Sequence, residues 1–62
     1  MNNQLRIDCR LLKALKGISY NEIAGYLEIS SSSFYNWIRG TYDLGETKQY
    51  KLKKILENLK ER

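Results

Sequence analysis

The pattern of apolar and polar positions between residues 17 and 40 predicts two short helices joined by a tight turn. Apolar residues recur at helical spacing through residues 20–27 and again through residues 31–39. The pattern is interrupted between these segments, at Glu28 and Ile29. Isolated helices shorter than roughly 12–15 residues are marginal in water. We therefore expect the two helices to pack on each other and on the rest of the chain.

Residues with helix-capping chemistry mark the ends of both helices. Ser19 and Glu22 have the spacing of a capping box, in which the hydroxyl accepts from one free amide and the carboxylate reaches back to another. Ser30 is a good N-cap for the second helix, and Gly40 can end that helix in the left-handed conformation. Glu28 is the predicted turn residue, where a positive φ costs on the order of 1 kcal/mol that glycine would avoid.

Two longer helices are predicted on either side of this pair, over residues 4–16 and 46–60. The apolar stripe of the first consists of Leu5, Cys9, Leu12 and Leu15. The apolar stripe of the last consists of Leu52, Ile55, Leu56 and Leu59. Ile7 and Leu11 widen the apolar surface of the first helix. We expect them either to pack under a neighbouring helix or to contact a second chain. The sequence thus predicts an all-α fold.

The helix predicted over residues 31–39 divides into two unlike faces, because successive side chains are about 100° apart. The apolar face carries Phe34, Trp37 and Ile38. The opposite face carries Ser32, Tyr35, Asn36 and Arg39. This polar face has no carboxylate, which suits a surface of hydrogen-bond acceptors and phosphates. The alternative is an ordinary solvated face, although such faces usually mix Lys and Glu.

Length and charge are compatible with the same kind of partner. Sixty-two residues make a single domain, residues 1–62, with a net charge of +4. Basic side chains favour nucleic acid, because counterion release from phosphates supplies most sequence-independent affinity. Solubility alone is the other explanation of the charge. The excess lies in residues 32–62, which hold seven basic and four acidic groups and whose lysines either face solvent or steer DNA.

What the chain lacks excludes several classes of protein. It has no histidine, so Cys/His zinc sites and the commonest general base are missing, and we expect no enzyme, no metal and no cofactor. Its single cysteine, Cys9, falls on a predicted buried stripe and is interpreted as a core residue. No apolar run approaches ~20 residues, and the N-terminus is too polar for a signal peptide, so we expect a cytoplasmic protein without a membrane partner. Since we expect no enzyme, we also expect no small-molecule substrate.

The spacing of these residues resembles the helix-turn-helix of the lambda-repressor/Cro-like family, also called the XRE family. The matching positions are Cys9, Leu12, Lys13, Gly17, Ile18, Ser19, Ile23, Ala24, Leu27, Ile29, Ser30, Phe34, Trp37 and Gly40. The resemblance covers residues 5–40 well and extends weakly through residues 46–60. It implies a small lambda-repressor-like domain of four or five helices that binds double-stranded DNA, often as a dimer. It further implies a repressor-like transcriptional regulator of phage or mobile-element type.

The resemblance also implies which side chains contact DNA. Family members read bases in the major groove with the start and outward face of the third helix. The matching positions here are Ser31, Ser32, Tyr35, Asn36 and Arg39. Phosphate contacts commonly come from the residue that opens the second helix and from residues just past the closing glycine. The expected phosphate contacts here are Tyr20, Ser33, Thr41, Tyr42 and Lys48.

The sequence departs from the family pattern at three places. Glu28 stands where the turn usually carries glycine, which adds strain. Ile38 stands where the family often has a glutamate that pairs with a basic residue of the first helix, so Lys13 is left without that partner. A fifth helix, often used in dimerisation, is not seen after residues 46–60, which leaves a homodimer open.

Two other functions remain open at this stage. The first is a protein-interaction module, because Tyr35, Tyr42 and Tyr50 are expected to point outward and tyrosine is enriched at protein interfaces. The second is the DNA-binding end of a longer phage protein whose other activity lies elsewhere. Binding of single-stranded nucleic acid by exposed tyrosines has no motif in its favour.

Overall fold

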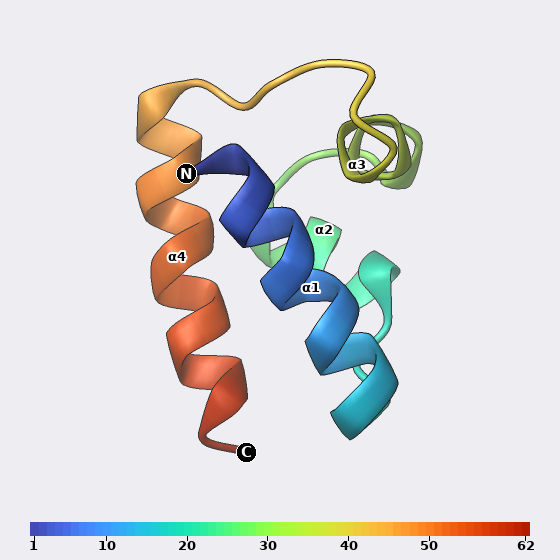
Figure 1. Cartoon of the computed structure of the whole chain (residues 1–62), viewed down its shortest axis with the longest axis vertical. Helices are drawn as coiled ribbons and strands as arrows, with labels where there is room; N and C mark the ends of the chain where they lie inside the picture. The colour runs from blue at the N-terminus through green and yellow to red at the C-terminus, as the bar shows by residue number, and fades with distance from the viewer.

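The computed structural model describes all residues from 1 to 62 and contains four α-helices and no strand. They are α1 (Asn2–Lys16), α2 (Tyr20–Leu27), α3 (Ser31–Ile38) and α4 (Glu46–Lys60). The two long helices α1 and α4 pack side by side, and α2 packs on both α3 and α4 (Figure 1). The segment of residues 39–45 crosses one end of the molecule from α3 to α4 (Figure 1). The predicted all-α fold is confirmed.

The helix boundaries follow the predicted ones closely. The bounds of α2 and α4 are as predicted, whereas α1 begins two residues earlier, at Asn2, because the Met1 carbonyl already accepts a bond from the Leu5 amide at 3.0 Å. The third helix ends at Ile38, one residue earlier than predicted, because Arg39 is its C-cap. None of the four helices combines the length and the apolar character that crossing a membrane requires.

Apolar side chains from all four helices and from the connecting segments share one core. The buried residues of this core are Leu5, Cys9, Leu12, Ile18, Ile23, Ala24, Leu27, Phe34, Trp37, Ile38, Leu44, Leu52, Leu56 and Leu59. The prediction that Leu15 belongs to the buried stripe of α1 was wrong, since Leu15 is 78% exposed. Its side chain projects about 120° around the helix from Cys9. Leu15 therefore shares an exposed side of α1 with Ile7 and Leu11.

The predicted caps are present, with one difference. The Ser19 hydroxyl accepts from the Glu22 amide and the Ser30 hydroxyl from the Ser33 amide, each at 3.1 Å. The Glu22 carboxylate does not complete a capping box. It lies 2.6 Å from the Arg62 guanidinium and also accepts a hydrogen bond from Tyr26. Hydrogen bonds from Arg62 and Tyr26 lower the pKa of Glu22 below its ordinary value.

At the turn between α2 and α3, the predicted turn residue Glu28 adopts the left-handed conformation, with φ 62° and ψ 39°. Its amide bonds the Gly25 carbonyl at 3.2 Å, and the following amide, of Ile29, bonds the Ala24 carbonyl at 3.1 Å. The turn thus closes α2 in the way a glycine C-cap would. Ile29 is directed back against the core, as predicted.

We expect Glu28→Gly to raise the free energy of unfolding by about 0.5–1 kcal/mol, because glycine removes the Cβ strain at positive φ. The variant also loses the ion pair of Glu28 with Lys51 at 3.2 Å, but both side chains are exposed and such a pair contributes little. Urea unfolding followed by circular dichroism measures the change. Gly40→Ala is the matched control: φ there is 85°, so alanine should destabilise the protein. A less stable Glu28→Gly variant would contradict the strain argument.

Candidate nucleic-acid interface

The polar side of α3 faces outward, as its sequence pattern predicts. Phe34 and Trp37 are fully buried beneath the helix. Of the predicted base-contacting residues, four are exposed and one is half-buried: Ser31, Ser32, Tyr35 and Arg39, with Asn36 the half-buried one. The structure therefore brings all five to one accessible side of a single helix.

Trp37 anchors α3 to the rest of the fold. Its ring lies 5.4 Å from that of Phe34, measured between centroids, and its indole N–H donates to the Asn2 side-chain oxygen at 2.8 Å. The same oxygen of Asn2 accepts from the Leu44 amide at 2.9 Å. One side chain at the start of α1 thus joins the third helix to the segment that follows it.

Arg6 is the one buried charged residue, and it holds the C-terminal end of α3. Its Nε donates to the Trp37 carbonyl at 2.6 Å, and its Nη2 donates to the Tyr42 carbonyl at 2.7 Å. The guanidinium also lies 5.2 Å from the Trp37 ring centroid and 3.0 Å from Asp43. The last carbonyls of a helix lack intrahelical partners and carry partial negative charge. A guanidinium placed there supplies the hydrogen-bond donors and also a compensating positive charge.

The roles of Asn2, Arg6 and Arg10 in holding α3 were not predicted from the sequence. Arg10, one turn after Arg6, donates to the Ile38 carbonyl at 2.8 Å and so extends the same contact. A signal was present, because Arg6 and Arg10 each directly follow a core residue of α1, Leu5 and Cys9, at the edge of the apolar stripe. Asn2 gives no comparable signal, since its partners lie 35 and 42 residues away.

Asn36 and Arg39 form a pair on the outward face of α3. One Nη2 hydrogen of Arg39 is donated to the side-chain oxygen of Asn36. Arg39 makes no ion pair, in contrast to Arg6 and Arg62. The carboxylates nearest to α3 in sequence are also neutralised, Glu28 by Lys51 and Asp43 by Arg6. The Arg39 guanidinium is therefore the one cationic group on this face without an ion pair.

Tyr20 joins an aromatic cluster at the side of α3. Its ring centroid lies 5.6 Å from that of Phe34 and 5.7 Å from that of Tyr35. The ammonium of Lys13 sits 4.4 Å from the Tyr20 ring centroid. Lys13, for which the sequence offers no glutamate partner, therefore finds the electron-rich face of an aromatic ring instead.

The remaining predicted phosphate contacts fall into two groups. Tyr42 and Ser33 lie together, because the Tyr42 hydroxyl donates to the Ser33 carbonyl at 2.8 Å. Thr41 is exposed beside them, and its amide closes α3 by bonding the Asn36 carbonyl at 2.9 Å. Lys48 is exposed on the first turn of α4. This helix begins where the segment that follows α3 ends (Figure 1).

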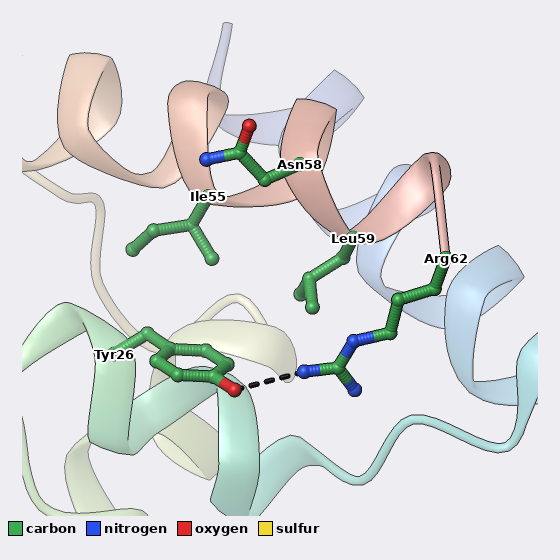
Figure 2. Close-up of a pocket in the computed structure, with 5 residues that line it drawn as sticks. All are labelled: Tyr26, Ile55, Asn58, Leu59 and Arg62. Carbon is green, nitrogen blue, oxygen red and sulfur yellow. Dashed lines mark hydrogen bonds between the residues drawn. The ribbon is translucent and has the colours of Figure 1, made fainter.

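One open pocket of about 310 Å³ lies away from α3, between α2 and the end of α4 (Figure 2). The ring of Tyr26 faces Ile55 and Leu59 across it, and Arg62 donates to the Tyr26 hydroxyl at 2.8 Å (Figure 2). No three His, Cys, Asp or Glu side chains gather closely enough to hold a metal ion. Burial raises the pKa of the Cys9 thiol to about 12, so this thiol stays protonated at neutral pH.

The outward side of α3 thus offers hydroxyl, amide, guanidinium and phenol groups without a carboxylate. These groups can donate to phosphate oxygens and base edges, and the phenol ring can contact apolar groups. No protein-family model, curated protein or solved structure matches the chain at a significant level.

Proposed function

We propose that this protein is a sequence-specific double-stranded DNA-binding module in which α3 enters the major groove. The observation that carries the proposal is the acid-free polar face of α3, held outward by the buried Phe34 and Trp37. A groove about 12 Å wide admits a helix. The order of α2, tight turn and outward α3 supports the same reading, because helix-turn-helix proteins dock their second helix in this way.

The side chains take two kinds of role in this proposal. Base edges are read by Ser31, Ser32, Tyr35, Asn36 and Arg39. Phosphates are contacted by Tyr20, Ser33, Thr41, Tyr42 and Lys48. Phosphate contacts set the position on the duplex, whereas base contacts set the sequence preference. Tyr42 must release the Ser33 carbonyl before its hydroxyl can donate to a phosphate.

A single module of this kind buries only roughly 600–1,000 Å² on DNA. Tight binding therefore favours two copies on adjacent half-sites or a larger parent protein. A cytoplasmic, repressor-like transcriptional regulator of phage or mobile-element type is the setting that the XRE resemblance suggests. DNA selection that yields a palindrome with half-sites one helical turn apart would establish the homodimer.

We expect binding to mixed duplex DNA to weaken by about 3- to 12-fold between ~50 and ~200 mM salt. This range corresponds to one or two cationic side chains, Lys48 alone or with Arg39, because the logarithmic slope is about −0.9 per contact. Gel retardation or fluorescence anisotropy across the salt range measures it. Lys48→Ala should reduce the slope by about 1 and weaken all sequences equally. Absence of any retardation at low salt would refute DNA binding.

A protein-interaction module is the second candidate, and two observations favour it. Tyr26, Tyr35, Tyr42 and Tyr50 are all exposed. An apolar stripe of Ile7, Leu11 and Leu15 also lies uncovered along α1. Tyrosine and exposed apolar area are both features of protein interfaces. This candidate becomes the better one if duplex DNA is not bound at low salt. The module as the DNA-binding end of a longer phage protein is compatible with either result.

A further inference from the structure

The pair of Asn36 and Arg39 carries a more specific inference about the bases that α3 selects. Arg39 follows Asn36 by three residues, so both side chains project from the same side of the last turn of α3. The Arg39 guanidinium makes one hydrogen bond within the protein, to the Asn36 side-chain oxygen, and no ion pair. Nothing else in the fold competes for this guanidinium.

The backbone holds the two residues in this relation. Arg39 is the helical C-cap of α3, with φ −79° and ψ −5°, and its amide bonds the Tyr35 carbonyl at 3.1 Å. Gly40 then turns the chain at φ 85°, and the Thr41 amide bonds the Asn36 carbonyl at 2.9 Å. These backbone hydrogen bonds fix the chain immediately after Arg39, which limits how far the Cα atom of Arg39 can move from Asn36.

The pair presents several hydrogen-bond donors and a single acceptor atom, one of whose two lone pairs is already used. Arginine has five N–H donors and no acceptor, and asparagine has two amide donors and one carbonyl oxygen. Here that carbonyl oxygen receives an N–H of Arg39. The groups left to face a ligand are the two amide hydrogens of Asn36, the unused hydrogens of Arg39 and the second lone pair of the Asn36 oxygen.

A surface on which donors outnumber acceptors distinguishes between base edges in the major groove. Guanine offers two acceptors, N7 and O6, whereas adenine offers one acceptor and one donor. Cytosine offers a donor, and thymine offers one acceptor beside a methyl group. Two-point pairing of Asn36 with adenine would have to share its carbonyl oxygen with Arg39, whereas a contact to guanine needs only donors. Guanine is the base whose edge matches the pair as it stands.

Resting on the DNA-binding function proposed above, we propose that Asn36 and Arg39 act as one unit that selects guanine followed by a second purine. Arg39 supplies the two-point contact to N7 and O6 of guanine. The amide of Asn36 donates to N7 of the neighbouring base, an acceptor that guanine and adenine share. Asn36 thus separates purine from pyrimidine and leaves the two purines undistinguished.

Selection of bound sites from random duplex DNA tests this inference, followed by affinity measurements on single-base variants of the best site. We expect the wild-type protein to enrich guanine next to a purine. Arg39→Lys keeps the positive charge and loses the planar fork, so discrimination for guanine should fall by about 5- to 150-fold with the salt slope unchanged. Asn36→Ala should keep the guanine preference and lose the preference for a neighbouring purine.

The controls separate this inference from the broader one. Lys48→Ala should weaken every site equally, and thermal unfolding should show that the changes at half-buried position 36 and exposed position 39 leave the fold intact. The wild-type protein could instead select adenine, with a preference that is lost in Asn36→Ala and kept in Arg39→Lys. This result would overturn the guanine inference while leaving DNA binding established. A guanine preference that survives Arg39→Lys would overturn it too. Failure of all duplexes to bind at low salt would overturn the proposed function itself.

Discussion

Trp37→Ala is expected to lower the free energy of unfolding by about 3–5 kcal/mol. Trp37 is 0% exposed and contacts the Phe34 ring, the Arg6 guanidinium and the Asn2 side chain. At about 0.05–0.15 kcal/mol per residue, a chain of this length has only about 3–9 kcal/mol of stability in total. The variant should therefore be largely unfolded at room temperature, which far-ultraviolet circular dichroism and urea titration measure.

Two further variants locate the source of that loss. Trp37→Phe keeps an aromatic ring but loses the indole N–H, so we expect a smaller loss of about 1–2 kcal/mol. The Asn2 oxygen keeps its bond from the Leu44 amide in this variant. Ser32→Ala, an exposed change on the same helix, should alter stability by less than about 0.5 kcal/mol. A Trp37→Ala protein as stable as Ser32→Ala would mean that the ring does not hold α3.

Arg6→Ala is expected to lower the free energy of unfolding by about 3 kcal/mol. The change leaves the Tyr42 carbonyl without the bond that Arg6 supplies and removes the cation from the Trp37 ring. Hydrogen bonds to charged groups contribute about 1.5–3 kcal/mol each and are not additive, so the total is less than their sum. Hydrogen exchange should also show faster exchange in residues 40–44, because Arg6 joins this segment to α1.

Comparison with two milder variants shows which contacts of Arg6 matter. Asp43→Asn removes the ion pair, but the Asp43 side chain is mostly exposed, so we expect a change below about 1 kcal/mol. Arg10→Ala removes a single bond to the Ile38 carbonyl and should cost about 1 kcal/mol. If Asp43→Asn proved as destabilising as Arg6→Ala, the ion pair would be the main contribution and the backbone bonds would be secondary.

The position of α3 links these stability predictions to the proposed function. In the proposed function, the side chains of α3 that we assign to bases can reach a groove only while Trp37 and Arg6 hold the helix against α1. Substitutions at these two residues should therefore weaken DNA binding without changing base preference among the molecules that remain folded. Changes at Asn36 and Arg39 should alter base preference and leave the stability of the fold nearly unchanged, since both side chains lie on the outward face.

The positions of the helices could be predicted from the sequence, because their signals are local. Gly17 and Gly40 adopt positive φ at helix ends, Ser19 and Ser30 accept from amides three residues later, and apolar spacing marks the core faces. Glu28 was predicted as the turn residue in the same way, and the structure shows that it adopts the left-handed conformation. The outward face of α3 follows too, because Phe34 and Trp37 must be buried together and the residues opposite must then face away.

Contacts between distant segments were decided only by the tertiary structure. Glu22 pairs with Arg62 from the end of the chain instead of completing a capping box, and Arg6 bonds carbonyls 31 and 36 residues away. Leu15 was assigned to the core from periodicity alone, yet no helix covers its side of α1. Periodicity and capping residues specify backbone hydrogen bonds within a few residues. Which side chains meet across helices depends on how the four helices pack, and local patterns do not encode that.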